Sequence, residues 1–413
     1  MVPKGWSSVQ AQDVCKSISV GVVIKPTQYY VPEGYGVKAF RSANVREGFI
    51  NDSDWVYFSH EGHAINKKSH LKTGDVLIVR TGYPGTACVV TPEFEGSNAI
   101  DIVIARPDMD KIIPEYLCAY TNSHIGKSQV LDLQGGMAQK HLNVGAYQVL
   151  KINLPPLREQ KKIAQILLTW DNAISVTEKL LANSQRQKKA LMQQLLTGNK
   201  RLLDENGVRF SGEWKITKLI QMGKVVSGGT PDTNMAMYWE GDILWLTPTD
   251  VTALTGRFVS NTSRKITPAG LLNSSAVLLP KGSLMVCTRA TIGALAISTS
   301  EICTNQGFKN IIPNEGFNIE FIYYLLQMNT NEMIKKSSGS TFLELSKKDF
   351  ETLSFSCPFI KEQQKIAAVL SAADTEISTL EKKLACLKDE KKALMQQLLT
   401  GKRRVKVDEA VAA

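Results

Sequence analysis

The chain has 413 residues, 43% of them apolar and 21% charged, so it is long enough for two or three globular domains and is not intrinsically disordered. Its net charge of +10 favours a polyanionic partner, because clustered Lys and Arg side chains release counterions from phosphates. The start, MVPKGW, lacks a secretion signal, and no run approaches the roughly 18 apolar residues of a membrane helix. The seven scattered cysteines show no C-x-x-C spacing, so we expect neither a disulfide framework nor a zinc site, and a cytoplasmic location.

Residues 1–155 are predicted to form a mixed α/β domain. The strand-like runs are DVLIV (75–79) and IDIVIA (100–105), and a helical pattern follows in PEYLCAYTNS (114–123). The segment HEGH (60–63) has its histidines at i and i+3 in a loop-like context, whereas a zinc helix has H-E-x-x-H, so no metal is expected there. Further on, GGMAQKHLN (135–143) reads as a glycine loop that leads to a helix capped by Asn143.

Residues 156–198 are predicted to form one long helix. It begins after Pro155-Pro156 and ends at Gly198, which suits a left-handed helix stop. Every fourth and then third residue forms one seam, with the period of a coiled coil: Ile163, Leu167, Trp170, Ile174, Thr177, Leu181, Ser184, Lys188, Leu191 and Leu195.

Residues 199–357 are predicted to form a second mixed α/β domain. Its strand-like runs are DILWL (242–246) and SLMVC (283–287), and IEFIYYLLQM (319–328) has a helical pattern. The stretch SGSTFLELS (338–346) lies at the same place as GGMAQKHLN in the first domain and offers Ser346 as a helix cap.

Residues 358–402 repeat the long helix, and residues 403–413 are expected to be a flexible tail. The eleven residues KKALMQQLLTG occur at 188–198 and again at 391–401, and the alignment runs without a gap from Gly136 and Gly339. Upstream the match is weaker, with Trp6 over Trp214. The second seam is more apolar than the first and consists of Ile366, Leu370, Ala373, Ile377, Leu380, Leu384, Leu387, Lys391, Leu394 and Leu398.

The fold class predicted is α+β, with two mixed α/β globular domains joined by two long helices in a pseudo-twofold tandem repeat. Thr177, Ser184 and Lys188 make the first seam too polar to bury strongly against itself, so we expect the helices to pack on each other. An antiparallel coiled coil is the simplest pairing, because a parallel one would require the second domain to run back along the rod. The alternative is two unrelated amphipathic helices, each docked on its own domain.

No catalytic signature is present in the sequence. There is no G-x-x-x-x-G-K-[ST] phosphate loop, no G-x-G-x-x-G after a strand, and no N-P-P-[YF] tetrapeptide of the kind used by amino-methylating enzymes. We therefore expect a protein that is not an enzyme by itself and whose function is binding.

The candidate DNA contacts lie in polar segments that follow strands. RTGYPG (80–85) and TRATIG (288–293) combine Arg, Thr and Gly, which suit phosphate and base-edge contacts, although the glycines could serve only the turn. From these loops come Arg80, Thr81, Tyr83, Thr288 and Arg289; Arg41, Gln139, Asn234 and Gln306 are further candidates for base contacts, and Lys140, His141 and Lys309 for phosphate contacts.

The repeated helices supply the candidate partner contacts. Two nearly identical helices present the same surface twice, so two copies of one partner could bind while the variable domains diverge. The exposed polar residues shared by both copies, chosen for partner contact or helix solubility, are Lys189, Gln193, Gln194, Lys392, Gln396 and Gln397.

The chain resembles the specificity subunit of type I restriction-modification systems over essentially its whole length. The resemblance is carried by the P-x-x-E-Q-x-K-I-A helix opening (Pro156 to Ala164, with Phe359 and Ile360 at the matching places after Pro358), the two L-L-T-G endings, and the loops GDVLIVRTGYPG and GSLMVCTRATIG. One departure is Thr288-Arg289-Ala290 where the first loop has Arg80-Thr81-Gly82, which puts the transfer of an arginine contact between the loops in doubt.

The resemblance implies that each variable domain reads one part of a split DNA sequence and that the helices dock two methyltransferase subunits, with nuclease-translocase subunits in the full complex. The chemistry would be adenine N6 methylation with S-adenosylmethionine, or ATP- and magnesium-dependent restriction, in the partners, with no cofactor bound by this chain. A helix pair about 50 Å long exceeds one duplex turn of about 34 to 36 Å, so both domains could face major grooves on one side of the DNA. Since the variable domains share little sequence, we expect an asymmetric site.

Three rival hypotheses belong to other classes. A self-sufficient nuclease or methyltransferase would act on DNA without partners. A coiled-coil scaffold or adaptor would bind proteins without sequence-specific DNA binding, and an RNA-binding adaptor would prefer structured RNA to duplex DNA.

Overall fold

The computed structural model describes residues 2–133, 141–338 and 343–407 and divides into two compact units. Unit 1 consists of residues 1–179 with 381–413, and unit 2 of residues 180–380. The expected division set whole helices apart from the domains, whereas the observed one cuts each long helix, because each half-helix packs on the domain at its own end. Within the described ranges, no helix is both long enough and apolar enough to cross a membrane.

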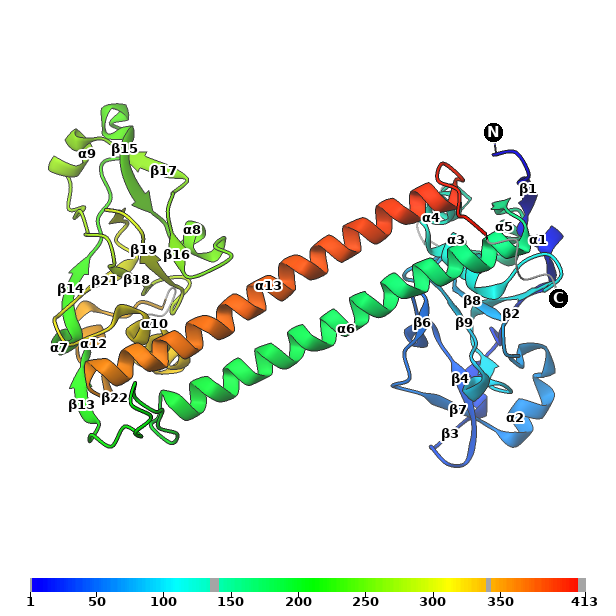
Figure 1. Ribbon diagram of the computed structural model, residues 1–413, viewed down its shortest axis with the longest axis horizontal. Helices are drawn as coiled ribbons and strands as arrows, with labels where there is room; N and C mark the ends of the chain where they lie inside the picture. Colours follow the sequence, from blue (N-terminus) through cyan, green and yellow to red (C-terminus); the bar gives the residue numbers. More distant parts are fainter. Residues whose placement is uncertain (1, 134–140, 339–342, 408–413) are drawn as a thin grey trace. The chain divides into compact units, whose positions relative to one another are not determined.

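Unit 1 contains two sheets of four strands and two strand pairs (Figure 1). The central sheet has the order β2-β11-β8-β9, all antiparallel, and β8 is buried along its whole length. The second sheet has the order β10-β4-β7-β3, and the pairs are β1-β12 and β5-β6. The strands are β1 Ser7–Gln10, β2 Cys15–Val20, β3 Tyr30–Val31, β4 Gly36–Phe40, β5 Val45–Arg46, β6 Phe49–Ile50, β7 Val56–Ser59, β8 Val76–Val79, β9 Ala87–Val89, β10 Asn98–Ala99, β11 Ile102–Pro107 and β12 Lys151–Leu154.

Short helices pack on the sheets of unit 1, with α2 on β7 and β4 of the second sheet and α1, α3 and α5 on strands of the central sheet. They are α1 Ala11–Val14, α2 His60–Ile65, α3 Pro114–Asn122, α4 His124–Asp132 and α5 Val144–Gln148. The expected cap of α5 is confirmed, since Asn143 Oδ1 accepts a hydrogen bond from the Ala146 amide at 2.7 Å. The core between sheet and helices includes Tyr116, Tyr120 and Tyr147, and burial raises the pKa of the Tyr147 hydroxyl.

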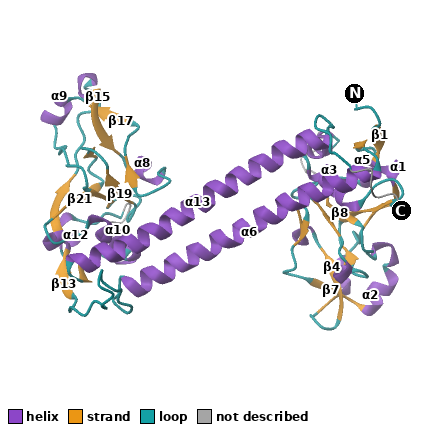
Figure 2. Ribbon diagram, in the orientation of Figure 1, coloured by secondary structure: helices purple, strands orange, loops and turns teal. Residues whose placement is uncertain are grey.

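Unit 2 repeats this plan with different sheet sizes (Figure 2). The larger sheet has the order β14-β21-β18-β19-β16, the smaller one β17-β15-β20, and β13 pairs with β22. The strands are β13 Lys215–Lys218, β14 Gly223–Ser227, β15 Trp239–Leu246, β16 Phe258–Val259, β17 Arg264–Ile266, β18 Leu284–Cys287, β19 Leu295–Ser298, β20 Cys303–Thr304, β21 Phe308–Pro313 and β22 Ser354–Cys357.

The short helices of unit 2 include α10, which has the bounds predicted from the sequence. They are α7 Leu219–Met222, α8 Pro248–Thr252, α9 Pro268–Leu272, α10 Ile319–Met328, α11 Thr330–Lys335 and α12 Lys347–Glu351. Ser346 caps α12 as expected, with its Oγ accepting from the Asp349 amide at 3.1 Å.

The two long helices are α6, Leu157–Leu195, and α13, Ile360–Leu399. All twenty seam positions predicted for them are buried or half-buried, whereas Lys189, Gln193 and Lys392 on the other faces are exposed. Each fully buried leucine of the seam stabilises the fold by about 2 kcal/mol relative to an exposed one. The predicted coiled-coil period is therefore confirmed.

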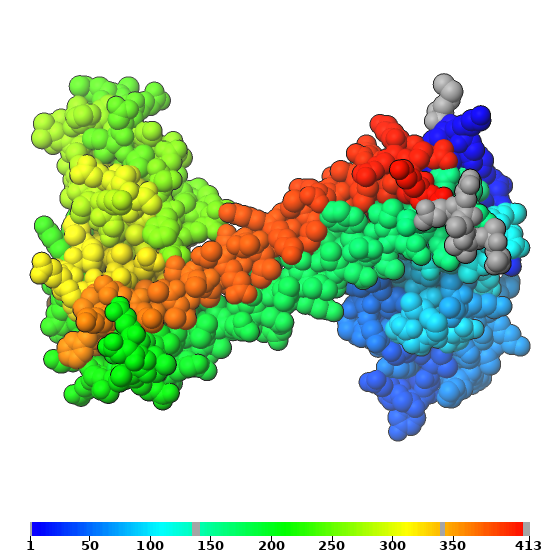
Figure 3. Space-filling model, viewed as in Figure 1, coloured from blue at the N-terminus to red at the C-terminus, as the bar shows by residue number. Residues whose placement is uncertain are grey.

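The helices run antiparallel within each unit. In unit 1, Asp171 of α6 pairs with Lys391 of α13, and Glu178 pairs with Lys388 at 2.7 Å, so the partner number falls as the number along α6 rises. In unit 2, Ser184 Oγ donates to Glu376 at 3.0 Å and Lys188 pairs with Asp374 at 2.6 Å, with the same direction. Figure 3 shows the side chains of α13, in red, against those of α6, in green, in unit 1.

The base of each helix pair is held by an arginine-glutamate-tryptophan clip. In unit 2, Arg201 forms two hydrogen bonds of 2.6 Å to Glu362, and the Trp214 indole donates to the same carboxylate at 3.3 Å. In unit 1, Arg404 and the Trp6 indole make the same contacts with Glu159.

Two expectations from the sequence differ from the structure, one about Arg404 and one about residues 60–63. Arg404 belongs to the segment expected to be a flexible tail, yet it pairs with Glu159 and also donates to the Lys4 carbonyl. The segment HEGH (60–63) is not a loop but the start of α2, capped by Ser59. Within the described residues, no cluster of three metal-ligating side chains occurs, and the His63 ring stacks on His70 with centroids 3.8 Å apart.

Candidate DNA interface

The turn after β8 in unit 1 holds its arginine inside the protein. Arg80 directly follows a buried strand and is only 9% exposed. Its Nε donates to the Leu142 carbonyl at 3.0 Å, and its guanidinium pairs with Asp101 and contacts the His141 ring. Arg80 therefore stabilises this turn, and its donors are not available to DNA in this structure.

The exposed groups of the unit 1 turn are the residues after Arg80. Tyr83 is 83% exposed at the tip, between Gly82 and Gly85, which have φ values of +89° and +84° that glycine adopts without strain. Thr81 is exposed, and its hydroxyl is 2.9 Å from His141 Nδ1. Thr81, Tyr83 and His141 thus form the accessible polar surface at this edge of the sheet.

The turn after β18 in unit 2 reverses this pattern. Thr288 is fully buried, and its hydroxyl donates to the Gly307 carbonyl at 3.2 Å. Arg289, the next residue, is exposed, and its side chain has no hydrogen bond or ion pair among the residues that the structure describes. Ala290 follows with a φ of +61°, in the region that favours glycine.

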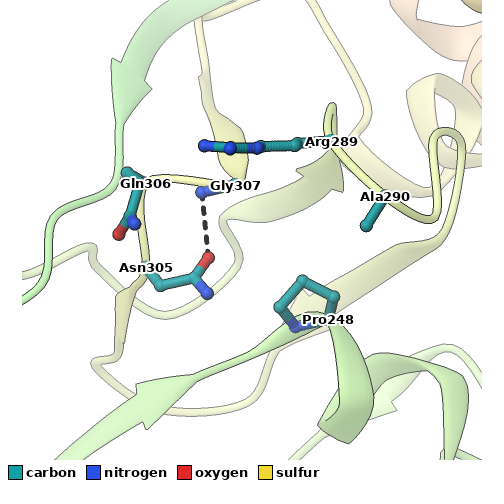
Figure 4. Close-up of a pocket in the computed structure, with 6 residues that line it drawn as sticks. All are labelled: Pro248, Arg289, Ala290, Asn305, Gln306 and Gly307. Carbon is teal, nitrogen blue, oxygen red and sulfur yellow. Dashed lines mark hydrogen bonds between the residues drawn. The ribbon is translucent and has the colours of Figure 1, made fainter. Parts of the chain in front are cut away.

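Arg289 borders a cavity of about 320 Å³, which is also lined by Pro248, Ala290, Asn305, Gln306 and Gly307 (Figure 4). Asn305 Oδ1 accepts from the Gly307 amide at 2.9 Å, and Gln306 Oε1 accepts from the Thr230 hydroxyl. Of the predicted residues, the structure thus brings Arg289 and Gln306 together. Asn305 was missed, although it lies in the same NQGFKN segment (305–310) as Gln306, and Pro248 carries no signal in the sequence.

Two further candidates, Arg41 in unit 1 and Asn234 in unit 2, have partners within their own units. Arg41 pairs with Asp54 at 3.0 Å, and Asn234 donates to Asp232 at 3.1 Å, so both are partly engaged on the surface. Gln139 and Lys140 lie outside the described residues.

Burial counts against three of the predicted contacts. Arg80, Thr288 and Lys309 are each less than a tenth exposed, so their polar groups are not presented at the surface of this structure, and their contact with DNA stays a prediction. Each lies on or directly after a central strand whose neighbouring residues are buried on both faces of the sheet, so a side chain at this place is enclosed whichever face it takes. Burial also lowers the pKa of the Lys309 ammonium below its ordinary value of 10.5.

The candidate partner surface on the helices is exposed, as expected for Lys189, Gln193, Gln194, Lys392, Gln396 and Gln397. In unit 1, Lys392 and Gln396 also line a cavity of about 980 Å³ between the helices and the domain, with Phe49 and Leu168 as apolar lining. In unit 2, Arg257 lies at the junction of helix and domain and contacts Glu320 at 2.8 Å.

This architecture, an α+β domain repeated twice with paired long helices, matches solved structures of one class of protein. The S subunit of a type I restriction-modification system from M. genitalium superposes with a TM-score of 0.58 at 15% identity, over 96% of this chain and 96% of that one, which is a likeness of fold.

The sequence comparisons define the family. The chain belongs to the family of the type I restriction modification DNA specificity domain, whose model matches residues 3–183 and 211–388. The MjaIX specificity subunit of Methanocaldococcus jannaschii is 40% identical over 172 residues, which are 41% of this chain and 40% of that protein. The putative MjaX specificity subunit of the same organism is 27% identical over 98% of this chain and 95% of its own length. The two matched ranges agree with the tandem repeat predicted from the sequence.

Proposed function

We propose that this chain is the DNA sequence-recognition subunit of a type I restriction-modification enzyme. Each unit reads one half of a bipartite, asymmetric DNA site through the turn after its central strand. The observation that carries this proposal is the pair of family domains in one chain, whose equivalent turns present different polar groups: Thr81, Tyr83 and His141 in one, Arg289, Asn305 and Gln306 in the other.

The chain has no catalytic role in this proposal. Methylation of adenine at N6 with S-adenosylmethionine, and ATP- and magnesium-dependent cleavage, take place in the partner methyltransferase and nuclease-translocase subunits. The chain itself binds none of these cofactors. Support comes from the family membership and from the names of the relatives, which are specificity subunits of restriction enzymes.

An exchange of domains tests the modular reading. Residues 1–150 are replaced by the corresponding segment of another family member, and methylated adenines are mapped across a genome that carries the chimera with its methyltransferase. We expect one half of the recognised motif to change and the other half to persist. A reciprocal exchange of residues 199–357 is the matched control. If both halves changed with either exchange, the proposal of one reader in each unit would be wrong.

The docking of methyltransferase subunits is proposed for the exposed repeated residues of α6 and α13. Lys392→Glu and Lys189→Glu change equivalent positions of the two copies, and both side chains are exposed. We expect each single variant to lower the number of bound methyltransferase subunits from two to one in native mass spectrometry, and the double variant to bind none. Lys382→Glu is the control, because this exposed lysine of α13 is not one of the six residues proposed for partner contact.

A coiled-coil scaffold without sequence-specific DNA binding is the alternative. The assembled complex would then protect DNA in a footprint without preference for any sequence. Binding of the complex to a duplex library, followed by sequencing of the bound fraction, separates the two functions: enrichment of one split motif supports the recognition subunit.

A further inference from the structure

The cavity beside Arg289 in unit 2 offers an unusual set of hydrogen-bonding groups. Arg289 is exposed, and within the described part of the chain its guanidinium has no hydrogen bond or ion pair. A guanidinium carries five N–H donors and no acceptor. None of these donors is engaged by a described residue, and Arg289 lines the cavity (Figure 4).

The orientation of the Asn305 amide adds a donor of the same kind. The Gly307 backbone N–H can only donate, so the atom of Asn305 that it contacts at 2.9 Å is the oxygen. The amide nitrogen therefore points away from Gly307, as Figure 4 shows, and no partner within the described residues accepts from it. The oxygen of Gln306 is engaged in the same way by the Thr230 hydroxyl. One lone pair remains on each amide oxygen, whereas the N–H donors of the three side chains have no acceptor among the described residues, so free donors outnumber free acceptors at this cavity.

A surface of donors selects among the base edges of the major groove. Guanine presents two acceptors there, N7 and O6, whereas adenine presents N7 beside an N6 amino donor, cytosine presents a donor, and thymine has one acceptor beside a methyl group. Clamping adenine requires an amide oxygen for N6 and an amide nitrogen for N7. Asn305 and Gln306 each already use one lone pair of the amide oxygen within the protein, so a clamp on adenine would need a second hydrogen bond to the same oxygen, whereas Arg289 offers donors only. This arrangement therefore favours guanine over adenine.

We infer that the cavity of unit 2 reads a guanine in the major groove, with Arg289 donating to N7 and O6 and the Asn305 amide as an additional donor. This inference rests on the proposed function and makes it specific: the half-site of unit 2 contains a guanine whose N7 is contacted. The half-site of unit 1 has no such requirement from the equivalent turn, because Arg80 is engaged with Asp101.

The backbone of the turn holds Arg289 in place. Ala290 has a φ of +61°, and its counterpart Gly82 in unit 1 has +89°, so the turn keeps a left-handed residue although glycine has been replaced. Strained residues of this kind persist where the surrounding structure fixes them, and they occur often at functional sites.

The test uses the complex of this chain with its methyltransferase subunits and duplexes that contain the mapped site. Each guanine of the unit 2 half-site is replaced in turn by 7-deazaguanine, which lacks N7, or by inosine, which keeps N7 and O6 but lacks the minor-groove amino group. We expect 7-deazaguanine at one position to weaken binding by about 10-fold, in the range of one bidentate contact. Inosine at that position leaves binding within about 2-fold.

Variants connect the guanine to Arg289. In Arg289→Ala, we expect binding to the natural site to fall by about 10-fold and the additional penalty of 7-deazaguanine to disappear, because the donor that N7 met is gone. Ala290→Gly allows the same backbone and should keep the guanine requirement. Arg209→Ala removes another exposed arginine of unit 2 that does not line the cavity, and controls for a general loss of positive charge.

The outcomes separate this inference from the proposed function. If the complex binds a split motif but the unit 2 half-site lacks guanine, or tolerates 7-deazaguanine at every guanine, the inference is wrong and the proposed function stands. If the 7-deazaguanine penalty persists in Arg289→Ala, another residue reads the guanine and the assignment to Arg289 is wrong. If the complex enriches no motif at all, the proposed function fails and the inference fails with it.

Discussion

The turns after β8 and β18 have the same backbone plan and use an arginine in opposite ways. In unit 1 the arginine is the first residue after the strand, and it is buried against Asp101 and the Leu142 carbonyl. In unit 2 the arginine is the second residue, and it is exposed beside a cavity while Thr288 takes the buried place. A shift of one residue along the chain therefore decides whether the same side chain stabilises the fold or remains free to bind.

The largest expected effect concerns the arginine-glutamate-tryptophan clips of the two units, whose arginines occupy equivalent positions but should contribute unequally to stability. Glu362 is 2% exposed, so Arg201→Ala leaves a carboxylate buried without its partner, and we expect the free energy of unfolding of unit 2 to fall by about 3 kcal/mol. Arg404 has 43% of its side chain exposed, so Arg404→Ala should cost unit 1 about 1 kcal/mol or less. Urea unfolding and calorimetry, each carried out on the full chain, measure the stability loss of both variants. Equal losses would contradict the effect of burial.

The two arginines of the turns provide the next test. Arg80→Ala removes the partner of Asp101 and of the Leu142 carbonyl, and we expect a loss of about 2 kcal/mol in the stability of unit 1. Arg289→Ala should change the stability of unit 2 by no more than about 0.5 kcal/mol, because the exposed side chain has no hydrogen bond or ion pair to lose among the described residues. Thermal unfolding of the two variants would show the difference directly. A large loss for Arg289→Ala would indicate a structural role.

Each turn has one residue with a left-handed backbone, Ala290 in unit 2 and Gly82 in unit 1, and exchanging the two residue types tests its cost. Ala290→Gly should raise the stability of unit 2 by about 1 kcal/mol, since the left-handed conformation costs an alanine roughly that amount and a glycine little. Gly82→Ala should lower the stability of unit 1 by a similar amount. No atom lies within 4 Å of a methyl group added at Gly82, so strain of the backbone alone would cause the loss. Hydrogen exchange of each unit reports both changes.

The smallest effect concerns a lysine in unit 2 that has an apolar counterpart in unit 1. Val286 pairs with Lys309 where Ile78 pairs with Val103, so Lys309→Val copies unit 1 into unit 2. Burial lowers the pKa of Lys309, and between this lowered value and 10.5 the unfolded chain binds more protons than the folded one. The stability of the natural unit 2 should therefore rise with pH through this window. In Lys309→Val the rise should be absent when the unfolding midpoints at pH 7 and pH 10 are compared.

Local patterns in the sequence were sufficient for much of the fold. The seam of α6 and α13, the caps Asn143 and Ser346, and the bounds of α10 follow from spacings within a few residues, and the structure confirms them. The antiparallel pairing was predicted from the way in which the second domain must connect the two helices, and the ion pairs within each unit confirm it. The helix α2 was missed, although HEGH (60–63) forms its first four residues and Ser59 caps it, because a helix of six residues is too short to show a hydrophobic period.

The candidate site was only partly accessible from sequence. A polar residue after a strand can face the solvent or the interior, and the choice for Arg80 and Thr288 depends on partners 61 and 19 residues away in His141 and Gly307. Asn305 and Gln306 directly follow β20, which pairs with β15 through two residue pairs only. A strand contact this short leaves no periodic signal in the sequence. Tertiary contacts of this kind decide which side chains meet at a surface.

The division of the long helices has a consequence for synthesis on the ribosome. Unit 2 is one continuous stretch, residues 180–380, whereas the core of unit 1 includes Leu398 and Leu399 from near the end of the chain. Domains commonly complete in the order in which they are translated. Here the second unit contains all of its segments while the first still lacks part of its core, so the N-terminal unit completes its core only after Leu399 has been synthesised.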